Sequence, residues 1–161
     1  MTKFLLSVHV LAAILAIGPI TVAASMFPRF VRTPDVDGDG SPGQNLRTAG
    51  LLHRVCRGYT VLGAAVPVFG VATGARLGVL TDAWLLASIV LTAAAAALLL
   101  FVILPGQERL LPEPAAGVAP GSVEARRAVA AWLAMVTGVF NLLWAVVVVL
   151  MIVRPGSTTG A

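Results

Sequence analysis

Residues 4–28 read FLLSVHVLAAILAIGPITVAASMFP, without an Asp, Glu, Lys or Arg. A helix needs about 20 mostly apolar residues to cross the hydrocarbon core of a bilayer, so this stretch is long enough to span a membrane once. Three further stretches lack the same four residue types, namely 58–75, 83–107 and 128–153. The chain is therefore predicted to be an all-α membrane protein with one integral membrane domain, residues 1–161. Its four transmembrane helices are expected at about 4–27, 54–75, 83–105 and 128–153.

The composition excludes several classes of protein. Of the 161 residues, 58% are hydrophobic and 11% are charged, against about 25% charged in soluble domains. The mean hydropathy is +0.96. These values argue against a soluble enzyme, a disordered chain and a nucleic-acid-binding protein. A single cysteine excludes a disulfide framework within the chain.

Basic residues predict the orientation in the membrane. The connections after the first and third spans carry eight of them, namely Arg29, Arg32, Arg47, Arg54, Arg57, Arg109, Arg126 and Arg127. The opposite side carries three, namely Lys3, Arg76 and Arg154. The positive-inside rule then places both termini outside the cell and the two longer connections in the cytoplasm. An antiparallel four-helix bundle follows. Anionic lipid headgroups are a sufficient partner for the net charge of +4, and no nucleic acid is needed.

The first span has a second interpretation as a cleaved signal peptide, because Lys3 precedes an apolar run that ends in small residues. The run is longer than a usual signal sequence and continues into Phe27. A retained span is the favoured interpretation.

Prolines and turn signals predict where helices bend, begin and end. Pro19 and Pro67 lie near the middle of the first two spans and are expected to kink them. The third connection is expected to run from Pro105 to Glu124 along the membrane surface, with at most a short turn at 107–111. Ser122 is expected to begin the fourth helix, and residues 74–82 are expected to form a tight turn.

Small and polar residues inside the spans predict how the helices associate. Gly70 and Gly74 form a GxxxG motif in the second span, and its expected use is close packing within the chain. Asn141 lies at mid-span in the fourth helix, where a buried amide is expected to bond another helix near Ser88 or Thr92.

His9 is the main candidate for chemistry, since an ionisable side chain inside a span indicates a function by default. It is expected just inside the outer interface, and two interpretations remain open. A neutral imidazole that bonds a neighbouring helix is favoured. The alternative is a haem or copper ligand, with Met151 at nearly the same depth as its partner. His53 is too far along the bilayer to share a metal with His9.

A second group of residues is expected at the opposite interface. Because the uncharged part of the second span is short, Arg54 and Arg57 at its start are expected to extend toward the headgroups. The expected membrane-surface anchor consists of Arg47, His53, Arg54, Arg57 and Tyr59. Cys56 lies among them and is expected to be a small buried hydrophobic side chain.

The first span also carries a family resemblance. HVLAAILAIGPI, from His9 to Ile20, followed by FPR at 27–29, resembles an uncharacterised family of bacterial four-helix integral membrane proteins, a domain of unknown function. It is more distantly similar to copper-resistance D-like proteins and HemJ-type protoporphyrinogen oxidases. The resemblance implies a four-span fold, and the distant one implies haem at His9. HemJ-type enzymes also imply a second functional basic residue in a later helix, and this chain has no lysine after Lys3 and no intramembrane arginine to take that place.

The expected function follows from these features. The chain is expected to be a non-enzymatic multi-pass protein of the cell membrane, an accessory or structural subunit that binds other membrane subunits, with no cofactor. The alternative is a haem- or copper-handling protein that uses His9 and Met151. A small-molecule channel or carrier ranks last because the spans lack a charged lining. Ten arginines against one lysine indicate a GC-rich bacterial genome.

Overall fold

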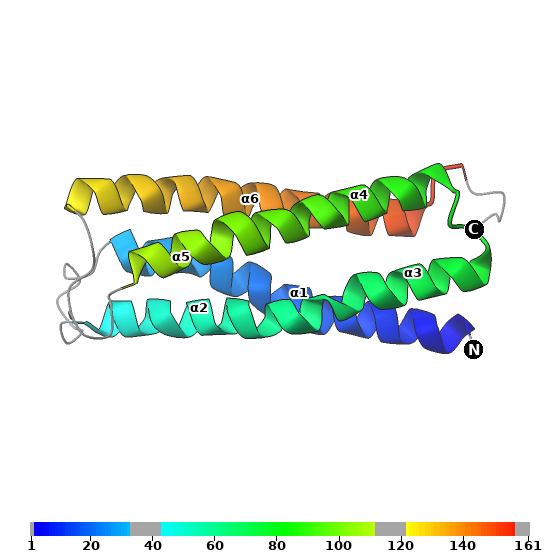
Figure 1. Ribbon diagram of the computed structural model, residues 1–161, viewed down its shortest axis with the longest axis horizontal. Helices are drawn as coiled ribbons and strands as arrows, with labels where there is room; N and C mark the ends of the chain where they lie inside the picture. Colours follow the sequence, from blue (N-terminus) through cyan, green and yellow to red (C-terminus); the bar gives the residue numbers. More distant parts are fainter. Residues whose placement is uncertain (1, 33–42, 112–121, 157–161) are drawn as a thin grey trace.

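The computed structural model describes residues 2–32, 43–111 and 122–156, and within these ranges the regular structure is helical. In chain order the helices are α1 (Thr2–Arg32), α2 (Gln44–Gly63), α3 (Ala65–Leu77), α4 (Ala83–Leu98), the π-helical segment η1 (Leu99–Ile103), α5 (Leu104–Leu110) and α6 (Val123–Val153). The segments α2–α3 and α4–η1–α5 each act as one long rod, because their breaks do not reverse the chain (Figure 1).

The four rods are long and apolar enough to cross a membrane, as the sequence predicts for four helices. They are Lys3–Arg32, Gln44–Leu77, Ala83–Leu110 and Val123–Val153. Each is longer than the uncharged stretch that predicted it, because the helices continue into sequence that carries arginines. Most of their large apolar side chains face outward, as in a protein whose solvent is lipid.

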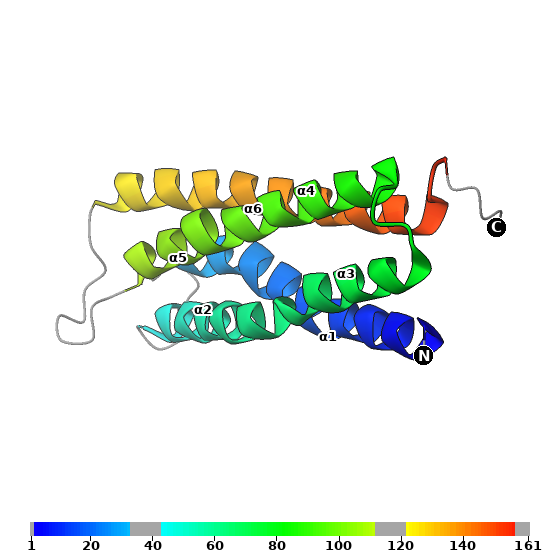
Figure 2. The ribbon, with the colours of Figure 1, turned by 45° about the vertical axis from the view of Figure 1, so that its right-hand side comes forward.

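The four rods lie lengthwise side by side, with α2–α3 next to α1 and α4–η1–α5 next to α6 (Figures 1 and 2). We call one end of the molecule the terminal end, where α1 begins, α3 ends, α4 begins and α6 ends. The other is the loop end, where α1 and α5 end and α2 and α6 begin. Below, the terminal half means residues 2–18, 64–94 and 145–156, and the loop half means the remaining described residues.

Prolines affect the rods differently. The first rod stays helical through Pro19 and Pro28. The second rod breaks between Gly63 and Ala65, because Pro67 has no N–H to donate to the carbonyl of Gly63. At this break the N–H of Ala64 is shared between the carbonyls of Thr60 and Val61, each 3.3 Å away. The bend expected near Pro67 is thus a break one turn before it.

The prediction that the third span ends at Pro105 is wrong. The chain stays helical to Leu110, and a π-helical turn precedes the proline. Pro105 cannot donate to the carbonyl of Phe101, and the wider π turn accommodates the proline ring without ending the helix. The extra residue in that turn rotates the following face, so that Gly106, Gln107 and Leu110 are buried.

The remaining helix ends follow the local sequence. The fourth rod begins at Val123 as predicted, where the hydroxyl of Ser122 accepts a hydrogen bond from the N–H of Ala125 at 3.3 Å. Helix α3 ends at Leu77, and the residue that follows, Gly78, has a φ of +70°, in the left-handed region that glycine adopts without strain. The connection between α3 and α4 is thus residues 78–82, shorter than the predicted turn.

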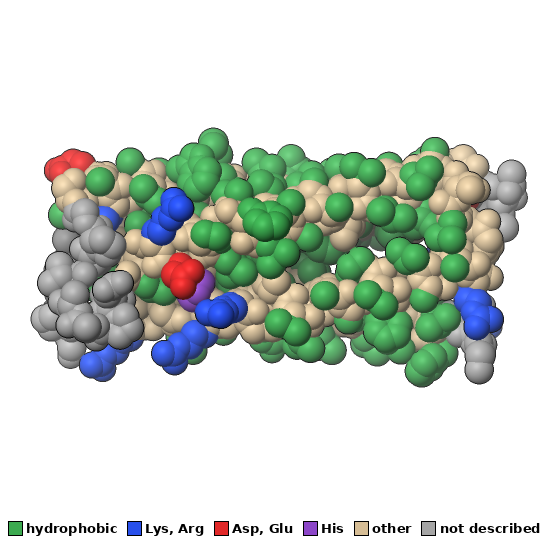
Figure 3. All heavy atoms as spheres, in the orientation of Figure 1, with side chains coloured by type: hydrophobic (Ala, Val, Ile, Leu, Met, Phe, Trp, Pro, Cys, Tyr) green, Lys and Arg blue, Asp and Glu red, His purple; other side chains and the backbone are tan. Residues whose placement is uncertain are grey.

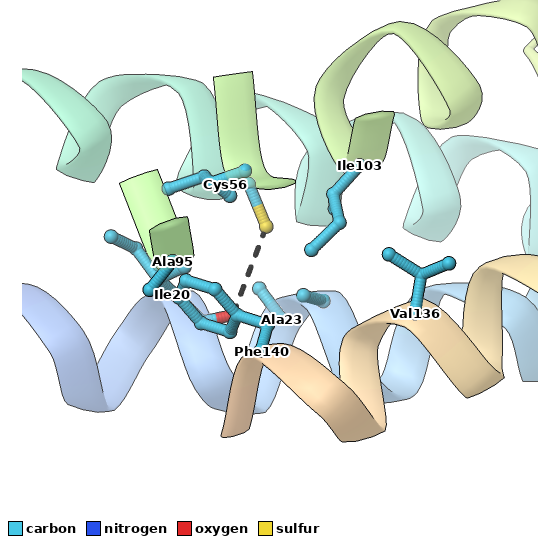
Figure 4. Close-up of a cluster of buried hydrophobic side chains, with 9 residues drawn as sticks. Ile20, Ala23, Cys56, Ala95, Ile103, Val136 and Phe140 are labelled. Carbon is cyan, nitrogen blue, oxygen red and sulfur yellow. Dashed lines mark hydrogen bonds between the residues drawn. The ribbon is translucent and has the colours of Figure 1, made fainter. Parts of the chain in front are cut away.

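The buried core lies in the loop half. One core cluster joins all four rods and includes Cys56 and Phe140 (Figure 4). A second cluster lies closer to the loop end and includes Phe27 and Leu133. Neither cluster contains a residue of the terminal half. There the pair α1–α3 diverges from the pair α4–α6 (Figure 2), and the surface is hollowed between α3 and α4 (Figure 3).

Candidate functional site

His9 joins α1 to the second rod in the terminal half. Its Nδ1 lies 2.9 Å from the carbonyl oxygen of Val66. The imidazole lies over Gly70, since its Cε1 is 2.9 Å from the position that a Cβ would take there. A glycine is therefore required for this ring to lie flat against α3. This arrangement corresponds to the favoured interpretation of His9, an imidazole that bonds a neighbouring helix.

The same contact defines the tautomer of His9. A carbonyl oxygen only accepts hydrogen bonds, so Nδ1 carries a proton in this contact, and in the neutral imidazole Nε2 then carries the lone pair. Histidines that bind metals almost always donate their other ring N–H to a carbonyl or carboxylate in this way. The geometry of His9 is therefore compatible with one metal bond through Nε2.

Met151 lies on α6, apart from the contact that His9 makes with α3. Its carbonyl oxygen accepts a hydrogen bond from Nε of Arg154 at 3.4 Å, and the guanidinium of Arg154 lies 5.7 Å from the centre of the Trp84 ring. The beginning of α1 and the end of α6 stand apart in both ribbon views (Figures 1 and 2). The structure does not bring the two helix ends that carry His9 and Met151 together.

Gly70 and Gly74 face different helices of the same chain. Gly70 faces the imidazole of His9 on α1, and a Cβ at Gly74 would lie 2.8 Å from a methyl group of Leu85 on α4. The GxxxG motif thus lets α3 approach two neighbours through two separate contacts.

A buried chain of polar groups, which no sequence pattern indicated, lies in the loop half. His53 Nδ1 donates to the side-chain oxygen of Gln107 at 3.1 Å. The amide nitrogen of Gln107 in turn donates to Cys56 Sγ at 3.7 Å. Cys56 donates to the carbonyl oxygen of Ile20 at 3.9 Å (Figure 4). Since Gln107 is 0% exposed, this chain connects α1, α2 and α5 through the interior.

The membrane-surface anchor is smaller than expected. Arg47, Arg54 and Arg57 are exposed, as an anchor requires. His53 does not belong to it, because its side chain is 8% exposed and bonds Gln107. Tyr59 does not belong to it either, since its ring packs against the core cluster that contains Cys56. The two side chains face the interior because they lie on the side of α2 that contacts α1 and α5.

Asn141 bonds another helix, but not the one expected. Its amide nitrogen donates to the hydroxyl of Ser25 on α1 at 3.1 Å. The expected partners lie on α4, where the hydroxyl of Ser88 instead donates to the carbonyl of Trp84 at 2.8 Å. The face of α6 that carries Asn141 is thus directed toward α1.

Besides Nε of Arg126 near the beginning of α6, three polar atoms along this helix have no hydrogen-bond partner among the described residues. They are the hydroxyl oxygen of Thr137, the side-chain oxygen of Asn141 and the indole nitrogen of Trp144, and all three atoms are buried. The residues are spaced by four and by three, which places them on one face of the helix. We call these three residues the α6 polar face. An unpaired buried polar group costs about 1–3 kcal/mol.

Comparisons with protein-family models, curated proteins and solved structures found no match. Within residues 2–32, 43–111 and 122–156, no three His, Cys, Asp or Glu side chains come together to hold a metal ion. Any function must therefore be inferred from the geometry of the chain.

Proposed function

We propose that the chain is a non-enzymatic integral membrane protein of a bacterial cell membrane. The supporting observation is that its reactive side chains form hydrogen bonds between helices. His9, His53 and Cys56 each form a hydrogen bond from one helix to another. Groups used in this way stabilise helix association in lipid. The expected result of replacing any of them is a less stable protein.

The proposed orientation is an antiparallel bundle with both termini outside the cell. Eight basic residues lie in or next to the connections at the loop end and three lie at the terminal end, and this difference supports a cytoplasmic loop end. Anionic headgroups of the inner leaflet are the proposed partner of Arg47, Arg54 and Arg57. Alkaline phosphatase fused after residue 161 tests the orientation. The fusion is expected to be active, and an inactive phosphatase with a fluorescent cytoplasmic reporter at the same site would contradict it.

The proposed role is that of an accessory subunit in a larger membrane assembly. Large apolar side chains are exposed along all four rods, so the chain offers a broad surface to other membrane helices as well as to lipid. Native electrophoresis of membranes solubilised in a mild detergent tests this role. The chain is expected to migrate in an assembly well above its 16.5 kDa. Migration as a lone chain in every mild detergent would contradict the role.

A second candidate function is supported by the tautomer of His9. With Nδ1 bonded to the carbonyl of Val66, Nε2 is free to bind haem iron or copper. Met151 is the proposed second ligand, and that pairing requires α1 and α6 to approach each other. Oxidised and reduced absorption spectra with metal analysis of purified protein test this candidate. A Soret band or stoichiometric copper that is lost in His9→Ala supports it, and a colourless, metal-free protein contradicts it.

The resemblance of the first span to the uncharacterised four-helix family is consistent with the four-span layout. We propose membership of that family on residues 9–20 and 27–29. This membership implies a fold and a membrane location, and it implies nothing about a substrate.

A further inference from the structure

The α6 polar face lies at the boundary between the packed and the open half of the molecule. Thr137 is 2% exposed, and core residues of α6 lie on both sides of it, Leu133 toward the loop end and Phe140 toward the terminal end. Beyond Trp144, α6 continues into the half that contains no core cluster. The three polar atoms are buried, so a molecule that entered between the diverging helix pairs would reach Trp144 first, with Asn141 and Thr137 behind it.

The face is directed toward α1. The amide nitrogen of Asn141 already bonds the hydroxyl of Ser25 on that helix. Side chains on a helix lean toward its N-terminus, so Trp144 and Asn141 extend back along α6 toward Thr137. The indole of Trp144 is further oriented by Phe140, whose ring meets it edge-on with centroids 6.3 Å apart. The three unpaired atoms thus lie on one short stretch of one helix interface.

The chemistry of these atoms selects a partner. The indole N–H of Trp144 only donates a hydrogen bond, and the carbonyl oxygen of Asn141 only accepts one. The hydroxyl of Thr137 does either. A hydroxyl group is the smallest ligand group that accepts from Trp144 and donates to Asn141 at the same time. A ketone, an ether or an ester accepts only, so it would leave the oxygen of Asn141 unpaired.

The ligand is also constrained by charge. Residues 4–28 and 128–153 contain no Asp, Glu, Lys or Arg, so these parts of α1 and α6 offer no such charge to a ligand between them. A charged headgroup would be unpaired there, which is costly in the interior of a membrane.

We propose that the α6 polar face binds the hydroxyl of a neutral, membrane-soluble alcohol or phenol whose apolar part lies in the open terminal half. Thr137, Asn141 and Trp144 hold the hydroxyl, and the diverging pairs α1–α3 and α4–α6 surround the apolar part. This site uses neither His9 nor Met151 and goes beyond the accessory role proposed above.

The test uses Trp144 as its own reporter. The chain has three tryptophans, so Trp84→Phe and Trp132→Phe together leave Trp144 as the one emitting indole. The protein in lipid nanodiscs is titrated with farnesol and, separately, with farnesyl methyl ether, which has the same chain but no hydroxyl proton. Farnesol is expected to shift the Trp144 emission saturably, with a midpoint about tenfold lower than that of the ether, the value of one hydrogen bond.

Matched variants assign the effect to the site. Asn141→Leu keeps the side-chain size and is expected to abolish the difference between alcohol and ether. Thr137→Val is expected to weaken the binding of both probes, since it removes a hydroxyl that can pair with either. Thr73→Val is the control, because the Thr73 hydroxyl already donates to the carbonyl of Phe69 at 2.7 Å. This control is expected to leave both midpoints unchanged.

Several results would overturn the proposal. Equal midpoints for alcohol and ether would show that the hydroxyl is not recognised. A response without saturation would show partition into the lipid alone, with water sufficient for the polar face. Native mass spectrometry of the unmodified protein provides a second readout that does not depend on the Trp→Phe changes. A one-to-one farnesol adduct that is lost in Asn141→Leu is expected, and its absence would also contradict the site.

Discussion

The loop half and the terminal half are built from the same four rods, yet their helices meet in different ways. In the loop half large side chains interlock, and Phe27, Ile103, Leu133 and Phe140 are each at most 1% exposed. The terminal half also buries residues, but neither core cluster includes them. They are Ala16, Val66, Thr73, Gly74, Trp84, Leu85, Ser88 and Val147. The contacts there are single ones, such as the bond from His9 to Val66.

This difference shows what holds helices together in lipid. Burial in lipid gains little from the hydrophobic effect, since the tails are as apolar as leucine. Stability must come from close packing, which large interlocked side chains supply over many atom pairs. The terminal half lacks that packing and is thereby free to open. We expect the loop half to be the stable part of the fold and the terminal half to be the adaptable part.

The largest expected effect comes from truncating one buried leucine in each half. Leu133→Ala leaves a cavity among the second core cluster and is expected to cost about 4 kcal/mol of unfolding free energy. Leu85→Ala, against Gly74 in the terminal half, is expected to cost about 2 kcal/mol because its neighbours can collapse. Steric trapping in mixed micelles measures both. Equal costs would remove the distinction between the halves.

Adding a methyl group to a glycine sharpens the same comparison. A Cβ at Gly106 would lie 2.7 Å from a methyl group of Leu133, and that leucine is held by the core. Gly106→Ala is therefore expected to cost about 3 kcal/mol. In Gly70→Ala the new methyl group contacts the imidazole of His9, which can rotate away within the terminal half. The expected loss of unfolding free energy is therefore about 1 kcal/mol. A larger loss for Gly70→Ala would contradict the account.

Breaking the buried polar chain is expected to have a smaller effect. Gln107→Leu leaves the Nδ1–H of His53 without its partner and is expected to cost about 1.5 kcal/mol. The double variant with His53→Leu is expected to recover part of that loss, because neither polar group then remains unpaired. A double variant less stable than the sum of the single ones would refute the contact as described.

The smallest expected effect lies at the boundary of the two halves. Ser25→Ala removes the hydroxyl that accepts from Asn141, and about 0.6 kcal/mol is expected, the average for hydrogen bonds between membrane helices. The same unfolding assay measures it. A loss above about 2 kcal/mol would mean that Ser25 has a structural role beyond this one bond.

Uncharged length was sufficient to predict four long apolar helices, because a helix that crosses a bilayer needs that pattern in its sequence. Ser122 was likewise a local signal and marked the start of α6 correctly. These features depend on neighbours in the chain. They could be predicted because the physical cause lies in a few adjacent residues.

Features that depend on helix rotation could not be predicted. Pro105 indicated the end of a helix, but the π turn before it accommodates the ring and turns Gln107 inward. That rotation places the amide beside His53, which the sequence had placed at the headgroups. The predicted partner of Asn141 was also wrong, because spacing along α6 defines a face but does not identify the helix that this face contacts. The tilt of whole helices decides such contacts.

Hydrogen exchange is the most direct test of the central claim, which is that packing is concentrated in the loop half. The protein in a single detergent is exchanged and digested, and the two halves of α1 and of α6 are compared, leaving out the last turn at each end. Weakly packed helices open at lower free energy and exchange faster. The loop halves are expected to exchange at least about tenfold more slowly than the terminal halves, a difference of about 1.4 kcal/mol. Uniform protection along both helices, or faster exchange in the loop half, would contradict the account.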